Sequence, residues 1–175
     1  EQRVRDAGLP VRLLRAGAYP LRELAQERQL VVVISSQGDG DPPDDAIGFC
    51  EFIAGKRAPK LSQLKFSVLG LGDSSYPKYC AVSRELDARL AELGGTRLTA
   101  LGEADVDFEV AAADWSARAL ESARGVLSGP TASPRSGNLL HAVTTQPLHS
   151  REHPFAAEVL ENQRVGPLHV EAEGI

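Results

Sequence analysis

Two loops of this chain combine glycines with acidic and hydroxyl side chains, and each follows a run of β-forming residues. The first is SSQGDGDPP at 35–43, directly after VVVI, and the second is LGDSSYPKYC at 71–80, directly after FSVLG. A glycine-rich loop after a buried strand is typical of a phosphate-binding site. Because the aspartates of these loops repel phosphate, neither loop predicts such a site.

The loops offer a different set of groups: backbone N–H and C=O, hydroxyls, the amide of Gln37 and the aromatic ring of Tyr76. These groups suit an uncharged planar ring with polar edges, and stacking on Tyr76 adds about 0.5–1.5 kcal/mol by analogy with aromatic pairs. Glycine and aspartate after a strand are also ordinary turn residues. Tyr79 and Cys80 also fit the first turn of a following helix, packed inward. Two such loops at consecutive strand ends favour the ring site over plain turns.

The elements that position these loops alternate regularly between strand and helix. The β-branched runs lack polar alternation, which suits strands buried on both faces of a parallel sheet. The pattern predicts a doubly wound α/β sheet, in which ligands bind outside the carboxyl ends of the strands. Strands are predicted at 11–17, 30–36, 66–71 and 96–104, and helical segments at 21–26, 44–55, 82–95 and 107–125.

Apolar residues at helical spacing predict which face of each helix is buried. The predicted faces are Ile47, Cys50 and Ile53; Val82, Leu86, Leu90 and Leu93; and Phe108, Ala112, Trp115 and Ala119. The acids Glu103, Asp105, Asp107 and Glu109 are interpreted as a solvated face, with a docking surface as the alternative.

Composition narrows the classes of function. The 175 residues carry a net charge of −5 without a basic run, which disfavours nucleic acid and anionic membranes and favours a partner with a basic face. No window approaches the roughly 18 apolar residues of a membrane span. Two cysteines form no disulfide framework, so we expect a reducing cytoplasm. The chain has no methionine and no apolar signal peptide, and we expect it to be a piece of a longer protein.

The composition changes after residue 127. We predict a domain at 1–127, a Ser/Pro/Gly-rich linker at 128–153 and the truncated start of a further domain at 154–175. The four histidines all lie in the linker and tail. His149 and His153 are four residues apart but have helix-breaking neighbours and no further ligand, so no metal site is predicted.

Several segments together carry a family resemblance: ISSQGDGDPPDDA, FSVLGLGDSSYPKYC, LDARLAELGGTRL and ADVDFEVAAADW. They resemble the flavodoxin-like FMN domain of the diflavin reductases over roughly residues 1–127. Within that family the resemblance is greatest to the flavoprotein (alpha) component of NADPH–sulfite reductase. Cytochrome P450 reductases are the alternative, but they carry an aromatic residue at the position of Gln37 and Asn at that of Asp73. The tail segment PFAAEVLENQRV looks like the entry to the family's FAD-binding domain.

The resemblance implies which residues contact the flavin ring, with Tyr76 as the stacking partner. They are Ser35, Ser36, Gln37, Gly38, Leu71, Gly72, Asp73, Ser74, Ser75, Tyr76, Tyr79 and Cys80. The family's FMN phosphate lies in a Ser/Thr-Gly-Asn loop after its first strand, and nothing at 1–175 matches that loop. We therefore expect the first strand, central in the sheet, and the phosphate loop to be missing, and this piece alone to be inactive.

The resemblance also implies the function. NADPH reduces FAD, FAD reduces FMN, and FMN passes electrons to a sirohaem and iron–sulfur hemoprotein subunit that reduces sulfite to sulfide for sulfate assimilation and cysteine biosynthesis. FAD and NADPH are expected on domains after Ile175, so the chain's own FAD/NADPH domain is one partner and the hemoprotein the other. No general acid, base or nucleophile is implied, because the flavin carries the redox chemistry.

Two other readings fit less well, and a third stays open beside the family resemblance. A phosphoacceptor receiver domain requires a lysine after the last strand, and LTALGEA provides none. A dinucleotide-binding domain requires G-x-G-x-x-G, and GLGDSS lacks the third glycine. A non-binding fragment of a diflavin reductase is the third reading and is compatible with the family resemblance.

Overall fold

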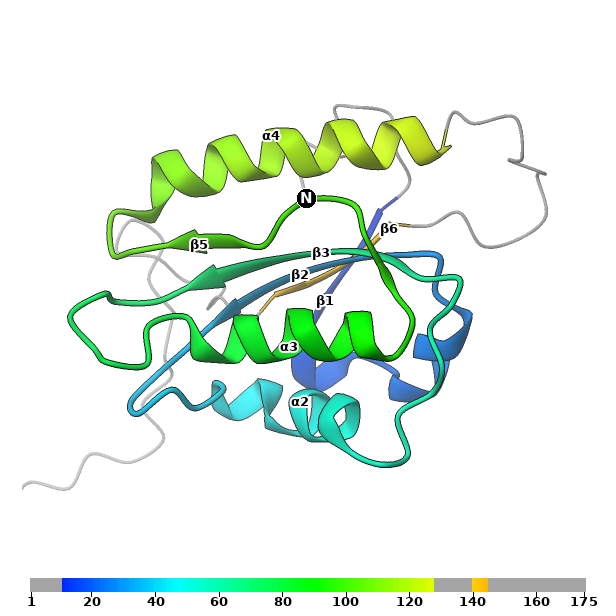
Figure 1. Cartoon of the computed structure of the whole chain (residues 1–175), viewed down its shortest axis with the longest axis horizontal. Coiled ribbons are helices and arrows are strands. Elements are labelled where there is room, and N and C mark those ends of the chain that lie inside the picture. The colour runs from blue at the N-terminus through cyan, green and yellow to red at the C-terminus, as the bar shows by residue number, and fades with distance from the viewer. Residues whose placement is uncertain (1–10, 128–139, 145–175) are drawn as a thin grey trace, which may run out of the picture.

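The computed structural model describes residues 11–127 and 140–144, which form a parallel sheet with helices on both faces (Figure 1). Helices α2 (Ile47–Ala54) and α3 (Ala81–Glu92) cover one face. Helix α4 (Phe108–Leu127) covers the other face. Helices on both faces of a parallel sheet are the doubly wound α/β arrangement. The predicted fold class is confirmed.

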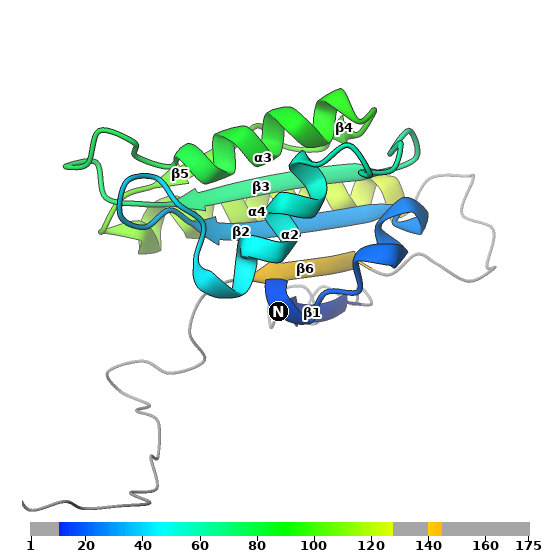
Figure 2. The same ribbon diagram turned by 90° about the horizontal axis from the view of Figure 1, so that it is seen from below.

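The sheet has six strands in the order β1-β6-β2-β3-β4, with β5 also paired to β3 (Figure 2). All neighbours are parallel. The single strand predicted at 96–104 is two short strands, β4 and β5, which follow one another along the same edge of β3. The strands are β1 (Val11–Arg15), β2 (Gln29–Ser35), β3 (Lys65–Leu71), β4 (Thr96–Arg97), β5 (Gly102–Ala104) and β6 (Leu140–Thr144).

Strand β6 is the largest departure from the sequence-based expectation, because it lies inside the predicted linker. Its five residues pair with β1 on one side and β2 on the other, so β6 is an interior strand next to the edge strand β1. Without it, both flanking strands would leave rows of backbone N–H and C=O groups unpaired. The surrounding serines, prolines and glycines dominated the linker interpretation and hid the short β-forming run LHAVT. The rest of the predicted linker and the predicted start of a further domain, at 128–139 and 145–175, lie outside the described residues.

The main core lies between the sheet and helices α2 and α3. Alternate residues of β2 and β3 meet the α3 stripe of Val82, Leu86 and Leu90 there, as the helical spacing predicted. A smaller cluster on the opposite face includes Trp115 and Ala119 of α4.

The predicted buried face of α2 was partly wrong. Ile47 is 40% exposed and Cys50 only half-buried, whereas Phe49 and Ile53 are buried. A 3₁₀ turn at Asp44–Ala46 precedes the helix. Phe49 packs edge to face against Tyr19, with the ring centroids 5.5 Å apart. Tyr19 follows the 3₁₀ turn Ala16–Ala18, and a second such segment, Leu21–Gln26, occupies the predicted helical segment.

Candidate functional site

The two predicted loops leave the sheet side by side. Ser35, the last residue of β2, is in register with Leu71, the last residue of β3. One residue further on, the Ser36 N–H donates to the Leu71 carbonyl at 2.9 Å. The parallel register therefore brings both loops to one edge of the sheet, at the carboxyl ends of the strands, as predicted.

The first loop closes on itself through its backbone. Gln37 and Asp41 exchange two N–H to C=O hydrogen bonds, each of 2.9 Å. Gly38 and Gly40 between them have φ of +51° and +90°, which glycine adopts without the steric cost that a side chain imposes. The Gln37 side-chain amide donates to the Pro42 carbonyl at 3.4 Å, so it also braces this loop.

The second loop is braced by Asp73. Its carboxylate accepts hydrogen bonds from the Ser75 N–H at 2.9 Å and the Ser75 hydroxyl at 2.6 Å. Two successive turns follow, in which Tyr76 N–H donates to the Asp73 carbonyl and Tyr79 N–H to the Tyr76 carbonyl, each at 3.1 Å. Tyr76 is 54% exposed. A large aromatic side chain held out on a braced loop is a suitable surface for stacking a planar ring.

The start of α3 joins the two loops. The Ser36 hydroxyl accepts a hydrogen bond from the Val82 N–H at 3.1 Å and so caps one of the unsatisfied donors of the first helical turn. Cys80, just before the helix, has the left-handed φ of +51°, which is uncommon for a residue with a side chain. Burial raises the pKa of the Cys80 thiol. Because that thiol points into the interior, Cys80 matches the inward-packed alternative and offers a ligand only its backbone.

Sequence reasoning missed Asp105. Its carboxylate accepts hydrogen bonds from the Ser74 N–H at 3.0 Å and the Val106 N–H at 2.8 Å, so it ties the end of β5 to the second loop. Asp105 was assigned to a solvated face with its acidic neighbours. The available signal was its position directly after a third strand, whose carboxyl end reaches the same edge of the sheet.

The hydrogen bonds from Ser74 and Val106 hold the pKa of Asp105 below its usual range, which predicts a dependence of stability on pH. A carboxyl whose pKa is lowered by folding stabilises the fold above its unfolded pKa of about 3.9, and that contribution is lost as pH falls through the lower folded pKa. Asp105→Asn should therefore lower the urea midpoint at pH 7 and show a smaller further loss below pH 4. Asp107→Asn, at an exposed neighbour, is the matched control; identical pH profiles of Asp105→Asn and wild type would contradict the prediction.

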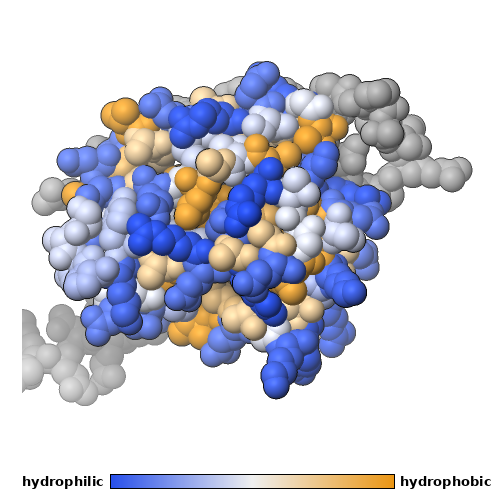
Figure 3. Space-filling model, in the orientation of Figure 1, coloured by the Kyte–Doolittle hydropathy of each residue, from blue (hydrophilic) through white to orange (hydrophobic). Residues whose placement is uncertain are grey.

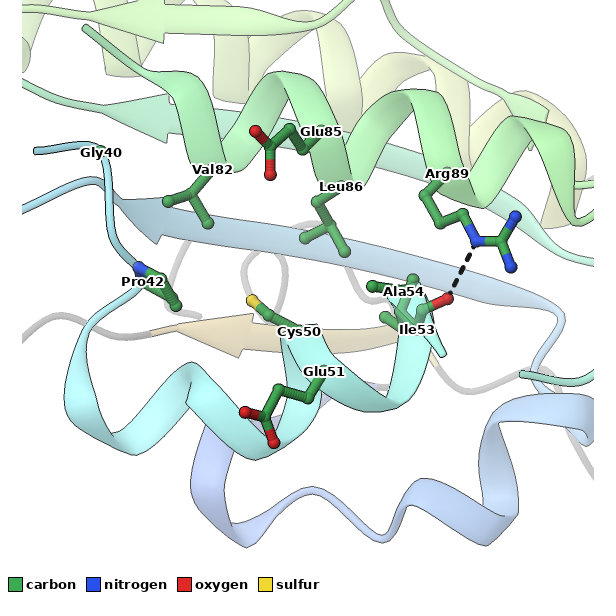
Figure 4. A pocket seen from close by; sticks show the side chains of 10 residues that line it. All are labelled: Gly40, Pro42, Cys50, Glu51, Ile53, Ala54, Val82, Glu85, Leu86 and Arg89. Carbon is green, nitrogen blue, oxygen red and sulfur yellow. Dashed lines mark hydrogen bonds between the residues drawn. The ribbon is translucent and has the colours of Figure 1, made fainter. Parts of the chain in front are cut away.

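A cavity of about 230 Å³ lies between α2 and α3, behind the first loop (Figure 4). It shares Gly40 and Pro42 with that loop, and Cys50 points into it. Burial, with a smaller contribution from the charge of Glu85, raises the pKa of the Cys50 thiol to about 11. None of the twelve predicted ring-contact residues lines this cavity.

Two further features of the described residues bear on the class of site. Among residues 11–127 and 140–144, no cluster of His, Cys, Asp and Glu side chains is arranged to hold a metal ion. No helix in the same described part of the chain is long and apolar enough to cross a membrane. On the face seen in Figure 3, apolar and polar residues are interspersed over α3 and α4.

Comparison with known proteins places the chain in a family. The flavodoxin family model matches residues 1–115. The chain belongs to the flavodoxin family. Over 161 residues it is 39% identical to the sulfite reductase [NADPH] flavoprotein alpha-component of Escherichia coli O1:K1. It is 38% identical to the protein of the same name from Shigella dysenteriae serotype 1. The predicted resemblance to this group is confirmed.

The matched region covers 91% of this chain but only 26% of each of these two relatives, so the chain spans about a quarter of their length. Solved structures show the same fold at lower identity. A Streptococcus pneumoniae flavodoxin has a TM-score of 0.62 at 22% sequence identity. The matched region covers 71% of this chain and 84% of that flavodoxin. A short-chain flavodoxin associated with a bacterial microcompartment has a TM-score of 0.58 at 18% identity, with 75% and 84% covered.

Proposed function

We propose that this chain is the FMN-binding electron-transfer domain of an NADPH-dependent diflavin reductase of the sulfite reductase type. The observation that carries the proposal is the pair of braced loops at one sheet edge, with the Tyr76 ring exposed on the second of them. The similarity to sulfite reductase flavoproteins supports it.

The residues present fit the ring half of FMN. Tyr76 would stack on the ring, and the backbone groups of the Gln37 and Gly38 turn and of the Gly72–Ser75 turn would meet its polar edge. FMN, when bound, supplies the transfer of single electrons. The nearby carboxylates of Asp39, Asp41 and Asp73 disfavour extra negative charge on a bound ring. The first loop's glycines and the absence of a basic side chain there are consistent with a ring site and not a phosphate site.

The partners follow from the same assignment. FAD and NADPH would be held by other parts of the polypeptide, which would reduce the FMN of this domain. The electrons would then pass to a sirohaem and iron–sulfur hemoprotein that reduces sulfite. The net charge of −5 suits docking to a basic surface of such a partner.

Replacing the stacking residue tests the assignment. In the full-length protein, Tyr76→Ala should weaken FMN binding about 2- to 13-fold, which corresponds to the 0.5–1.5 kcal/mol of a stacked pair. The measurement is titration of apoprotein with FMN, followed by quenching of flavin fluorescence. Val110→Ala, at a residue of α4 that is 73% exposed, is the control.

Two outcomes would count against the proposal. A folded full-length wild type that binds no FMN would overturn the proposed function. Equal affinities of Tyr76→Ala and wild type would remove Tyr76 from the ring site.

A further inference from the structure

Arg84 of α3 is clamped between a carboxylate and an aromatic ring beside the second loop. Its guanidinium donates two hydrogen bonds to Glu103 of β5, from Nε to Oε1 and from Nη2 to Oε2, the second at 3.1 Å. Its Cζ lies 5.8 Å from the centroid of the Tyr79 ring. A two-point fork to a carboxylate fixes the plane of a guanidinium more strongly than a single hydrogen bond does.

The Tyr79 ring also packs against the backbone of the second loop. A Cβ placed on Gly72 would lie 2.9 Å from the Tyr79 ring and 3.1 Å from the Cys80 nitrogen, so the ring packs directly on the loop backbone. Arg84 therefore contacts a ring that itself covers the backbone of the predicted flavin loop. Helix α3, strand β5 and the second loop meet at this point.

Two cations lie at this edge of the sheet, Lys78 of the second loop and Arg84, and Arg84 is the one held by a two-point fork to a carboxylate. Asp73 and Asp105 lie in or next to the second loop, and Asp39 and Asp41 lie in the first, so this edge of the sheet is rich in carboxylates. Arg84 is the cation that the fold fixes against an aromatic ring at this edge, through its fork with Glu103. A fixed cation lowers the free-energy cost of adding negative charge nearby.

We propose that Arg84 is a positioning residue for the ring site: held by Glu103, it orients Tyr79 and the backbone of the second loop, and its charge favours the reduced form of a bound aromatic ring. This inference rests on the proposed function and deepens it. The ligand class is a planar, reducible ring that gains negative charge on reduction. Arg84 acts through Tyr79 and needs no contact with the ligand.

The alternative is that Arg84 and Glu103 form an ordinary surface ion pair, which contributes little to stability and nothing to ligand binding. Exposed pairs contribute about 0–1 kcal/mol to stability, and Arg84 is 52% exposed. Such a pair would affect stability alone, without a preference between the oxidised and reduced forms of a ligand. The ratio of the two affinities therefore separates the two roles.

The experiment uses the full-length protein loaded with FMN and measures its dissociation constant in the oxidised and reduced forms, with the urea midpoint of each variant. Arg84→Gln should weaken binding of reduced FMN about two- to fivefold more than binding of oxidised FMN, a ratio that corresponds to about 0.5–1 kcal/mol of screened attraction between the guanidinium charge and the negative charge of the reduced ring. Glu103→Gln, which removes the carboxylate that offsets the guanidinium charge, should shift the ratio in the opposite direction, toward tighter binding of reduced FMN. Arg84→Lys, which keeps the charge, should restore most of the preference.

Arg124→Gln is the matched control, because Arg124 forms an exposed ion pair with Glu121 one turn away on α4. An unchanged ratio of the two affinities in Arg84→Gln, or a ratio that changes equally in Arg124→Gln, would overturn the role of Arg84 and leave the proposed function intact. A wild type that binds no FMN in either form would overturn the proposed function and this inference with it.

Discussion

Gly70→Ala is expected to destabilise the chain by about 1–3 kcal/mol, the usual cost of overpacking a core. Gly70 lies in β3 where that strand passes under α3. An added Cβ would overlap the Ser83 hydroxyl and lie 2.7 Å from the Ser83 Cβ and 3.3 Å from the Cys80 Cβ. Ser83 is fully buried, so it has no space into which to move.

The same substitution should disturb the candidate site. The Ser83 hydroxyl donates to the Cys80 carbonyl at 2.8 Å and so fixes the residue at which the second loop turns into α3. Displacement of Ser83 would shift that turn, and with it the loop that carries Tyr76. We therefore expect FMN affinity and stability to fall together in Gly70→Ala.

Urea denaturation with two companion variants makes the measurement specific. Gly48→Ala is the control: no atom lies within 4 Å of an added Cβ, and alanine in a helix should raise stability by about 0.5–1 kcal/mol. In the double variant Gly70→Ala with Ser83→Gly, the overlap is removed and part of the stability should return. Equal losses in the single and double variants would show that the overlap is not the cause.

Val143→Asp should destabilise the 175-residue chain by about 3–5 kcal/mol, because it buries a carboxylate without a partner. Val143 is 1% exposed and lies in the main core, on a strand paired on both sides. Val143→Ala, which removes two methyl groups and leaves a cavity, should cost about 2 kcal/mol.

The control for this series is Val110→Asp, at an exposed position of α4 where a carboxylate remains in water. Stability is read from urea or thermal unfolding of the three variants beside wild type. Similar values for Val143→Asp and Val110→Asp would mean that residue 143 is not buried in the sheet in solution.

Much of this fold and site was predictable because the spacing of apolar residues along a strand or helix indicates which of its faces are buried. The continuous apolar run of β2, followed by a second β-forming run in β3, predicted a parallel sheet, and the register of Ser35 with Leu71 then placed the two loops together. The α3 stripe was equally clear because Val82, Leu86 and Leu90 repeat at helical spacing. The assignment of individual residues to flavin contacts stays a prediction.

What sequence reasoning missed depended on contacts between distant segments. Asp105 was placed on a solvated face, since no local pattern shows that its partner is the backbone of Ser74, 31 residues away. The fork between Arg84 and Glu103 joins α3 to β5 in the same way. Strand β6 was hidden because a five-residue run inside a polar segment carries too little periodicity to be separated from a linker.

The position of β6 between β1 and β2 also has a consequence for folding during biosynthesis. Leu140 pairs with Gln29, which the ribosome makes more than one hundred residues earlier. At roughly 5–20 residues per second, β1 and β2 wait about 5 to 20 seconds before the strand between them exists. During that interval β1 has no partner in the described sheet and one edge of β2 is unpaired, and such edges are sites for chaperone capture or intermolecular pairing. The closing step joins segments far apart in the chain, so it is expected to set the pace of folding.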